Sequence, residues 1–152
     1  NRKILNLPSN ISMVKIYLDT CVWCRPFDEP RERILKESEA LIEILGMADR
    51  GQIEILGSSI LLAEVSFISS EEKREAVKAL IRKVCRIFKV DRDVVELAEE
   101  IMKNCGIDAV DAMHVAFASL NADVFITVDG ELLKKAECLE KYIDVRSPIN
   151  MV

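Results

Sequence analysis

Hydrophobic and polar positions along the chain follow two periods, one typical of buried strands and one typical of helices. Residues 14–18 (V-K-I-Y-L) are apolar at nearly every position, which predicts a strand buried on both faces. Ser58 or Ser59 is expected to cap a short helix, and Ser69 with Glu72 has capping-box spacing for the next one. The predicted strands are residues 14–18, 53–56, 86–90, 123–128 and about 142–146. The predicted helices are about 31–50, 60–67, 70–84, 91–105, 108–120 and 130–136.

This alternation of strands and helices predicts βαβ units and therefore a parallel sheet covered on both faces. The expected fold is α/β, a three-layer α/β/α sandwich around a central parallel sheet of about five strands. Residues 13–152 are expected to form one domain, since the chain of 152 residues is long enough for a single core. Residues 1–12 precede the first strand and are expected to be a vector-derived or disordered lead.

Composition narrows the class of protein without deciding its function. A net charge of −5 gives no sign of a surface that binds polyanions over the whole molecule, so any nucleic acid must meet local basic side chains or bound cations. Five cysteines do not suggest a disulfide framework and fit a reducing cytosol, where thiols stay free. No apolar run approaches the roughly 20 residues that cross a bilayer. A cytoplasmic protein without membrane contact is expected.

Acidic residues follow two of the predicted strands. Asp19 comes directly after the first strand and Asp129 directly after the fourth. In parallel sheets, ligands bind beyond the carboxyl ends of the strands, where the strand order reverses. If these two strands are neighbours, both carboxylates face the same crevice.

Two further acids are isolated in apolar helices. Glu64 is the only charged residue from Ile55 to Ser70, and Asp111 is the only one from Ala109 to Ala122 at neutral pH. An unpaired carboxylate inside a buried helix costs several kcal/mol or becomes protonated, so such an acid usually has a cationic partner or faces a cleft. No basic residue lies nearby in the sequence. A divalent cation would relieve the repulsion of four converging carboxylates.

Oxygen ligands favour Mg²⁺ or Mn²⁺ over zinc, which prefers His and Cys. A magnesium ion held by a few carboxylates keeps several waters and commonly meets its substrate through phosphate oxygens. The pattern therefore indicates metal-assisted hydrolysis of a phosphodiester.

Each acid also has a purely structural interpretation. Asp19 suits a turn, Glu64 suits a side chain that reaches solvent, and Asp129 with Gly130 suits a turn. Asp108 is preferred as the N-cap of the helix that carries Asp111, although its carboxylate is also a candidate metal ligand. Only the combination of strand-end placement with four acids favours a metal site.

One histidine and one cysteine pair complete the candidate chemistry. His114 lies one helical turn after Asp111 and is expected to be partly buried and to orient that carboxylate. Cys21 and Cys24 form a C-x-x-C, which is the basis of a third hypothesis, a thiol oxidoreductase. Such a motif belongs at the start of a helix, and the helical pattern here resumes only near Arg31. The two cysteines are therefore expected to pack as small side chains beside Trp23.

Four segments resemble the PIN (PilT N-terminus) domain, in order and spacing, over about residues 13–152. They are Y-L-D-T (17–20), the isolated Glu64, D-A-M-H-V-A (111–116) and D-V-F-I-T-V-D-G-E-L-L (123–133). The chain is similar to small prokaryotic members, many of which are toxin ribonucleases of VapC type. The resemblance implies a five-stranded parallel sheet and cleavage of RNA with Mg²⁺ or Mn²⁺. It also implies a homodimer and a small antitoxin as partner.

By position, the resemblance implies four acidic site residues, with two hydroxyl side chains near the metal. The acids are Asp19, Glu64, Asp111 and Asp129, and the hydroxyls are Thr20 and Thr127. The family commonly has Asn after the D-T pair, where this chain has Cys21. Arg25, Arg31 and Arg33 are candidates for phosphate contacts, against the alternative of a solvated loop and helix start. The leading hypothesis is a metal-dependent ribonuclease, and the second is a PIN module that binds without catalysis.

Overall fold

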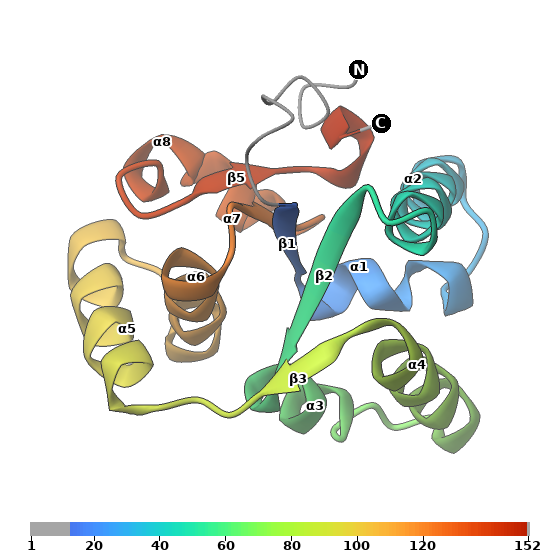
Figure 1. The fold of residues 1–152 in the computed structure, drawn as a ribbon, viewed down its shortest axis with the longest axis horizontal. Helices are drawn as coiled ribbons and strands as arrows, with labels where there is room; N and C mark the ends of the chain where they lie inside the picture. The colour runs from blue at the N-terminus through green and yellow to red at the C-terminus, as the bar shows by residue number, and fades with distance from the viewer. Residues whose placement is uncertain (1–12, 152) are drawn as a thin grey trace.

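The computed structural model describes residues 13–151, and the expectation for residues 1–12 lies outside this range. Five parallel strands form one sheet in the order β3-β2-β1-β4-β5 (Figure 1). The strands are β1 (Val14–Leu18), β2 (Ile53–Ser58), β3 (Arg86–Phe88), β4 (Val124–Ile126) and β5 (Asp144–Arg146). The helices are α1 (Thr20–Cys24), α2 (Glu32–Asp49), α3 (Ser59–Val65), α4 (Glu71–Val84), α5 (Arg92–Cys105), α6 (Ala109–Asn121), α7 (Gly130–Lys134) and α8 (Ala136–Leu139), with 3-10 turns η2 (Arg25–Phe27) and η3 (Pro148–Met151).

Alternate residues of the strands point to opposite faces of the sheet, and each face has its own core. Ile16 and Leu18 pack with residues of α1, α2, α3 and α4 on one face. Tyr17 packs with Phe125 and with residues of α5, α6 and α8 on the other. Figure 1 shows the two groups of helices on opposite sides of the strands. The expected three-layer α/β/α sandwich with a five-stranded parallel sheet is confirmed.

Several expected boundaries are correct and a few are wrong. Ser58 caps α3 as expected, whereas α4 is capped by Ser70 rather than by Ser69. The helix expected at 130–136 is two short helices, α7 and α8. β2 continues two residues further than expected because Gly57 lets it approach β3. A Cβ atom at Gly57 would lie 2.6 Å from Cδ1 of Ile87.

The short helix α1 was not expected, because five residues followed by a proline are too few to show a helical period. It begins at Thr20, so Cys21 lies in a first helical turn. The expectation that the C-x-x-C stands outside a helix is therefore wrong. Cys21 and Cys24 remain free thiols, and Cys24 is buried in the same core as Trp23.

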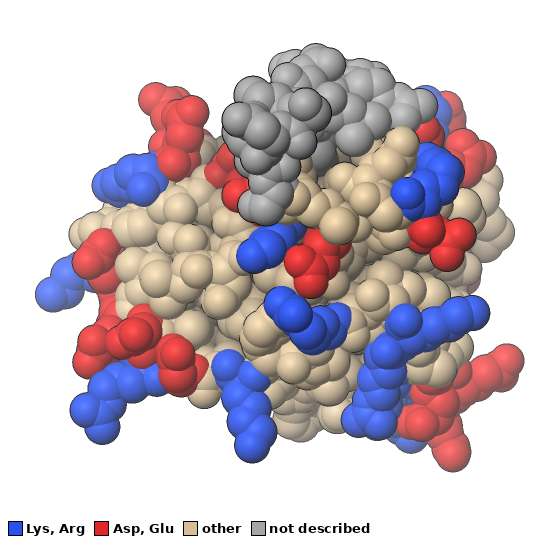
Figure 2. All heavy atoms as spheres, viewed as in Figure 1, with Lys and Arg blue, Asp and Glu red and all other residues tan. Residues whose placement is uncertain are grey.

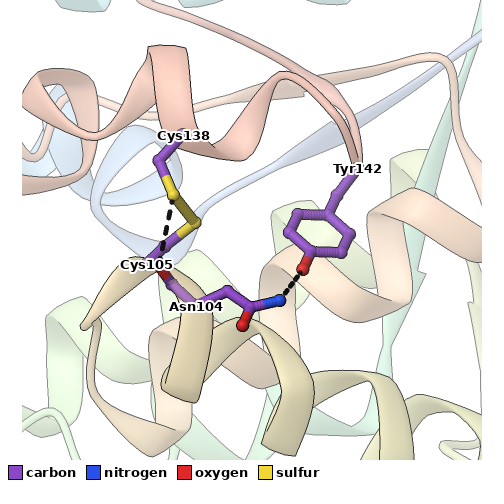
Figure 3. Close-up of a disulfide and its surroundings, with 4 residues drawn as sticks. All are labelled: Asn104, Cys105, Cys138 and Tyr142. Atoms are coloured by element: carbon purple, nitrogen blue, oxygen red, sulfur yellow. Dashed lines mark hydrogen bonds between the residues drawn. A yellow bond between two sulfur atoms is a disulfide. The ribbon is translucent and has the colours of Figure 1, made fainter.

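The expectation that all cysteines are free is also wrong, since Cys105 at the end of α5 is bonded to Cys138 in α8 (Figure 3). Beside this disulfide, the Asn104 amide donates a hydrogen bond of 2.7 Å to the Tyr142 hydroxyl. The disulfide joins the end of α5 to α8, and the hydrogen bond joins it to the segment between α8 and β5. Gly106 then ends α5 in the left-handed conformation, with φ of 66°. The chain is thereby fixed just before the helix that carries Asp111.

The surface carries charges of both signs. Figure 2 shows basic and acidic side chains interspersed on one face, with Lys and Arg side chains prominent over α4 and β3. Over residues 13–151, no helix is long and apolar enough to span a membrane.

Candidate metal centre

The candidate site lies where the strand order reverses. β1 pairs with β2 on one side and with β4 on the other, so the residues that follow β1 and β4 meet at one edge of the sheet. A hollow of about 310 Å³ opens at this edge. It is lined by Asp19, Thr20, Cys21, Glu64, Phe67, Ile68, Asp111 and Asp129. All four acids predicted from the sequence therefore line one pocket.

Asp19 is the most buried of the four acids. Its Oδ1 accepts a hydrogen bond of 2.9 Å from the backbone N–H of Thr20 and so caps α1. Its Oδ2 accepts a hydrogen bond of 2.8 Å from the Thr127 hydroxyl, and the Cys21 thiol lies 3.4 Å away. Burial raises the pKa of Asp19, and these hydrogen bonds only partly offset the loss of water. The carboxylate is thus rigidly held, with a charge that a cation would stabilise.

Glu64 enters the pocket from α3 and is held by two donors. Its Oε1 accepts hydrogen bonds from the Thr20 hydroxyl and from Nε2 of His114, the latter at 2.9 Å. The pKa of Glu64 is lowered, mainly by the hydrogen bond from His114. Its side chain is 39% exposed, against 7% for Asp19, because it projects into the hollow. Glu64 is therefore ionised and points toward the solvent side of the site.

His114 orients Glu64, and the expectation that it orients Asp111 is wrong. The buried ring accepts or donates a hydrogen bond of 2.7 Å at Nδ1 with the Tyr17 hydroxyl, which in turn is 2.7 Å from Oγ of Ser58. Its Nε2 faces Glu64 rather than the carboxylate one turn earlier on α6. Burial works against a charged ring, but the hydrogen bond to Glu64 and the Asp19 carboxylate outweigh it and raise the pKa of His114.

Asp111 lies in the first turn of α6, which Asp108 caps. Oδ1 of Asp108 accepts a hydrogen bond of 2.9 Å from the backbone N–H of Asp111, so the preferred N-cap interpretation of Asp108 is confirmed. Asp108 is exposed and does not line the hollow. Burial, together with the carboxylates of Asp19, Asp108 and Asp129, raises the pKa of Asp111 to about 7. These three carboxylates therefore lie close enough to Asp111 to disfavour its ionised form.

Asp129 follows β4 and caps α7, with its Oδ1 accepting from the backbone N–H of Glu131 at 2.9 Å. Its own backbone N–H donates to the Thr127 hydroxyl at 3.0 Å. Thr127 therefore bridges the side chain of Asp19 and the backbone of Asp129. Asp129 is thus the N-cap of a helix rather than part of a turn, and it lines the pocket as expected.

The donor set fits a hard divalent cation. Ligand atoms of Asp19, Glu64 and His114 lie within 4.8 Å of one another, and Asp111 and Asp129 line the same hollow. Both ring nitrogens of His114 already have hydrogen-bond partners, which leaves carboxylate oxygens to face the pocket. Oxygen ligands suit Mg²⁺ or Mn²⁺, and a His that holds a ligating carboxylate is a common outer support of a metal site.

The three candidate arginines have ion pairs of their own. Arg25 donates to Glu37 and to Asp28, both at 2.8 Å, and Arg31 lies 3.5 Å from Glu29 on the surface. Arg33 donates to Glu37 and also to the backbone carbonyl of Val128, next to Asp129. Its side chain is 66% exposed. Of the three, Arg33 is tied to the rim of the hollow.

The geometry weakens the oxidoreductase hypothesis for a reason other than the one expected. Cys21 stands at the start of a helix, but burial and the adjacent Asp19 carboxylate raise its thiol pKa. Burial also raises the pKa of Cys24. Thiol–disulfide exchange needs a thiolate, so neither thiol is suited to it.

Two other participants could not be predicted from the sequence. Tyr17 reads as one more apolar residue of a buried strand, yet its hydroxyl supports His114. Phe67 reads as the end of an apolar helix, yet it lines the hollow. Both roles depend on contacts between segments that are distant in the sequence. Such contacts cannot be predicted from a local sequence pattern.

Comparison with known proteins agrees with this geometry. The sequence matches the family model of the PIN domain over residues 16–137. No curated protein matches the sequence. Three solved structures share the fold over 88% of this chain. FitAcB from Neisseria gonorrhoeae is 21% identical, with a TM-score of 0.59 over 97% of its chain. FitAB bound to the IR36 DNA fragment is 23% identical, with a TM-score of 0.61 over 95% of its chain.

The third structure is VapBC2 from Rickettsia felis bound to a DNA fragment from its promoter. It is 17% identical, with a TM-score of 0.60 over 98% of its chain. At such identities these structures speak for the fold alone. The family model, in contrast, spans most of the chain and all four acids of the pocket. The protein therefore belongs to the PIN domain family.

Proposed function

We propose that this protein is a metal-dependent endoribonuclease that hydrolyses RNA phosphodiester bonds with Mg²⁺ or Mn²⁺. PIN domains are generally nucleases. The observation that carries the proposal is the convergence of Asp19, Glu64, Asp111 and Asp129 on one hollow at the switch point of the sheet. No basic side chain is among the residues that line this hollow, so the four carboxylates would hold a divalent cation.

Each residue of the hollow has a defined part in this proposal. Asp19 and Glu64 are the carboxylates whose oxygens are already oriented by hydrogen bonds, from Thr127 and from Thr20 and His114 respectively. Asp111 and Asp129 complete the acidic lining. When bound, a divalent ion supplies a Lewis acid that activates water and neutralises charge on the phosphate. The protein contributes fixed ligands and a small hollow open to solvent.

His114 is a positioning residue in this scheme. Because its ring is buried and its Nε2 is hydrogen-bonded to Glu64, it does not face the space that a substrate would occupy. Arg33 is the most suitable of the three arginines for a phosphate contact, since it is exposed and reaches the loop before Asp129.

The same proposal extends to partners, on the resemblance to toxins of VapC type. We infer that the protein acts in the cytoplasm as the toxin of a toxin–antitoxin pair, as a homodimer that a small antitoxin inhibits. The similar structures named FitAB and VapBC2 agree with membership in this branch of the family. Co-expression with any small reading frame found beside the gene, followed by co-purification, tests the antitoxin.

The deciding experiment compares two Asp→Asn variants on single-stranded RNA with Mg²⁺, Mn²⁺ or EDTA. Asp19→Asn removes the central charge of the hollow, so cleavage is expected to fall to the level measured in EDTA. Asp123→Asn makes the same change at the opposite end of β4, where the side chain accepts a hydrogen bond from the backbone N–H of Lys15. This control is expected to retain wild-type cleavage.

Cleavage that persists in EDTA or in Asp19→Asn would contradict the proposal. The second candidate, a PIN module that binds without catalysis, is separated by metal titration. It predicts no cleavage by the wild type and no binding of Mn²⁺ at millimolar concentration.

A further inference from the structure

Phe67 is the most exposed large hydrophobic residue in the part of the chain that the structure describes. Its side chain is 87% exposed, whereas Phe27 is 40% exposed and Phe117 and Phe125 are buried. A fully exposed phenyl ring costs solvation without contributing to the core. Its position at the rim of the acidic hollow therefore calls for an explanation in terms of binding.

Hydrogen bonds of the backbone fix the position of Phe67 relative to the candidate metal centre. The N–H of Phe67 donates to the carbonyl of Glu64 at 3.1 Å, and the N–H of Ile68 donates to the carbonyl of Val65 at 3.0 Å. Arg74 from α4 donates to the carbonyl of Ile68 at 3.0 Å. The turn that presents the ring is thus continuous with the helix that presents the Glu64 carboxylate.

The lining of the hollow has two chemically different parts. Phe67 and Ile68 are the apolar part of its lining, and the four carboxylates are the acidic part. One nucleotide has the same division, because a flat apolar base is joined through its sugar to a charged phosphate. Stacking of bases on aromatic side chains is the usual way in which proteins hold single strands, and it tolerates every base.

We infer that Phe67 is a stacking platform for a nucleobase of single-stranded RNA, next to the phosphate that faces the carboxylates. This inference rests on the proposed function and adds to it the residue that holds the substrate's base. It explains why an aromatic ring is left in solvent at this one point. A base paired within a duplex does not offer its face to such a ring, so the site selects unpaired RNA.

Fluorescence of 2-aminopurine tests stacking independently of cleavage, because its emission is quenched when the base stacks. Each protein is mixed with a single-stranded RNA of about ten nucleotides. The RNA carries 2-aminopurine at one position at a time, and the signal is followed by stopped flow with Mg²⁺. The wild type is expected to quench one position strongly before any product forms. Phe67→Ala is expected to lose that quenching and to bind roughly 5- to 150-fold more weakly, with a raised KM and little change in kcat.

Three variants make the result specific. Phe67→Trp is expected to restore quenching, while Phe67→Leu, which keeps an apolar side chain without a ring, is not. Ile42→Ala changes another exposed hydrophobic residue, 60% exposed on α2, and is expected to behave as the wild type. Equal quenching and affinity in Phe67→Ala and the wild type would overturn the inference and leave the ring as part of a protein-binding surface.

The two proposals fail in different ways. If the wild type quenches 2-aminopurine through Phe67 but never cleaves RNA with Mg²⁺ or Mn²⁺, the ribonuclease is wrong and the stacking platform stands. If the wild type cleaves RNA and Phe67→Ala changes neither KM nor quenching, the platform is wrong and the ribonuclease stands.

Discussion

Thr127 is the residue on which the geometry of the acidic hollow depends most directly. Its buried hydroxyl donates to Asp19 at 2.8 Å and accepts from the backbone N–H of Asp129 at 3.0 Å. One hydroxyl therefore joins the acids that follow β1 and β4. Its removal leaves Oδ2 of Asp19 with only the weak Cys21 thiol donor and leaves the N–H of Asp129 without this acceptor. A lost hydrogen bond of this kind costs about 1–3 kcal/mol.

Thr127→Val and Thr127→Ser separate this hydrogen bonding from packing. Valine has the same shape without the hydroxyl, so we expect the free energy of unfolding to fall by about 2 kcal/mol and Mn²⁺ to bind at least about 10-fold more weakly. Serine keeps the hydroxyl and loses one methyl group, which costs about 1 kcal/mol and should leave Mn²⁺ affinity near the wild-type value. Urea unfolding and calorimetric titration measure the two quantities. Equal loss of Mn²⁺ affinity in both variants would contradict this role.

Cys21 stands where the resemblance to the PIN domain implies Asn. Its thiol lies 3.4 Å from Oδ2 of Asp19 and 3.5 Å from Oγ1 of Thr127. A thiol is a weak donor, so Asp19 receives less support here than an amide would give. The raised pKa of Cys21 keeps the sulfur protonated and adds no further negative charge beside Asp19.

At the scale of elements, the geometry at the start of α6 distinguishes two roles for Asp108, an N-cap or a metal ligand. Its Oδ1 caps the helix through the N–H of Asp111, and the residue is exposed outside the hollow. Capping therefore accounts for Asp108 without any contact to a cation.

Asp108→Ser keeps a capping oxygen without a carboxylate, and Asp108→Ala removes both. We expect Asp108→Ala to lower the free energy of unfolding by about 1 kcal/mol and Asp108→Ser to change it little. Both should bind Mn²⁺ nearly as the wild type does, whereas Asp111→Asn should bind it clearly more weakly. If Asp108→Ser loses as much Mn²⁺ affinity as Asp111→Asn, Asp108 is a ligand and the cap is incidental.

Elements with strong local signals could be predicted from the sequence. β1 is correct to the residue, and the caps Ser58, Asp91 and Asp108 start the expected helices. Glu64 and Asp111 could be predicted from their isolation in apolar helices. Asp19 and Asp129 could be predicted from the rule that places ligands beyond the ends of strands. That rule requires β1 and β4 to be neighbours, and they are.

What the sequence did not disclose depends on contacts between distant segments. His114 faces Glu64 across 50 residues, and Cys105 meets Cys138 across 33. The period of α6 records only that His114 and Asp111 share a face, so the nearer acid looked like the partner. α1 was not predicted for a different reason. Its start is set by the Asp19 side chain, which caps it, and not by an apolar stripe.

At the scale of the whole molecule, the acidic hollow couples folding to pH and to divalent cations. Asp111 has a pKa of about 7 in the folded protein, against an ordinary value of 3.8. The metal-free folded state therefore binds a proton here that the unfolded chain has already released. By linkage, this group makes the protein less stable as pH rises from about 4 to about 7. The reason is that the ionised carboxylate is partly removed from water and is also repelled by Asp19, Asp108 and Asp129.

A divalent cation reverses this penalty, because it takes the place of the proton. We expect the gain in Tm on adding Mn²⁺ to be small at about pH 5, where Asp111 is protonated, and larger at about pH 8, where it is charged. When the free ion exceeds its Kd about 100-fold, the gain corresponds to about 2.7 kcal/mol. Thermal unfolding in Mn²⁺ and in EDTA, at fixed ionic strength, measures the difference.

Asp111→Asn isolates the contribution of this one carboxylate from those of Asp19 and His114. In EDTA the variant should be more stable than the wild type at about pH 8, where its neutral amide avoids the repulsion, and the difference should vanish near pH 4. In Mn²⁺ at about pH 8 the order should reverse, because the wild type alone has the full set of ligands. Asp123→Asn, at the far edge of the sheet, should follow the wild type throughout. If Asp111→Asn is as stable as the wild type in EDTA at every pH, the ionised Asp111 carboxylate does not destabilise the fold. The electrostatic argument for a bound cation would then be wrong.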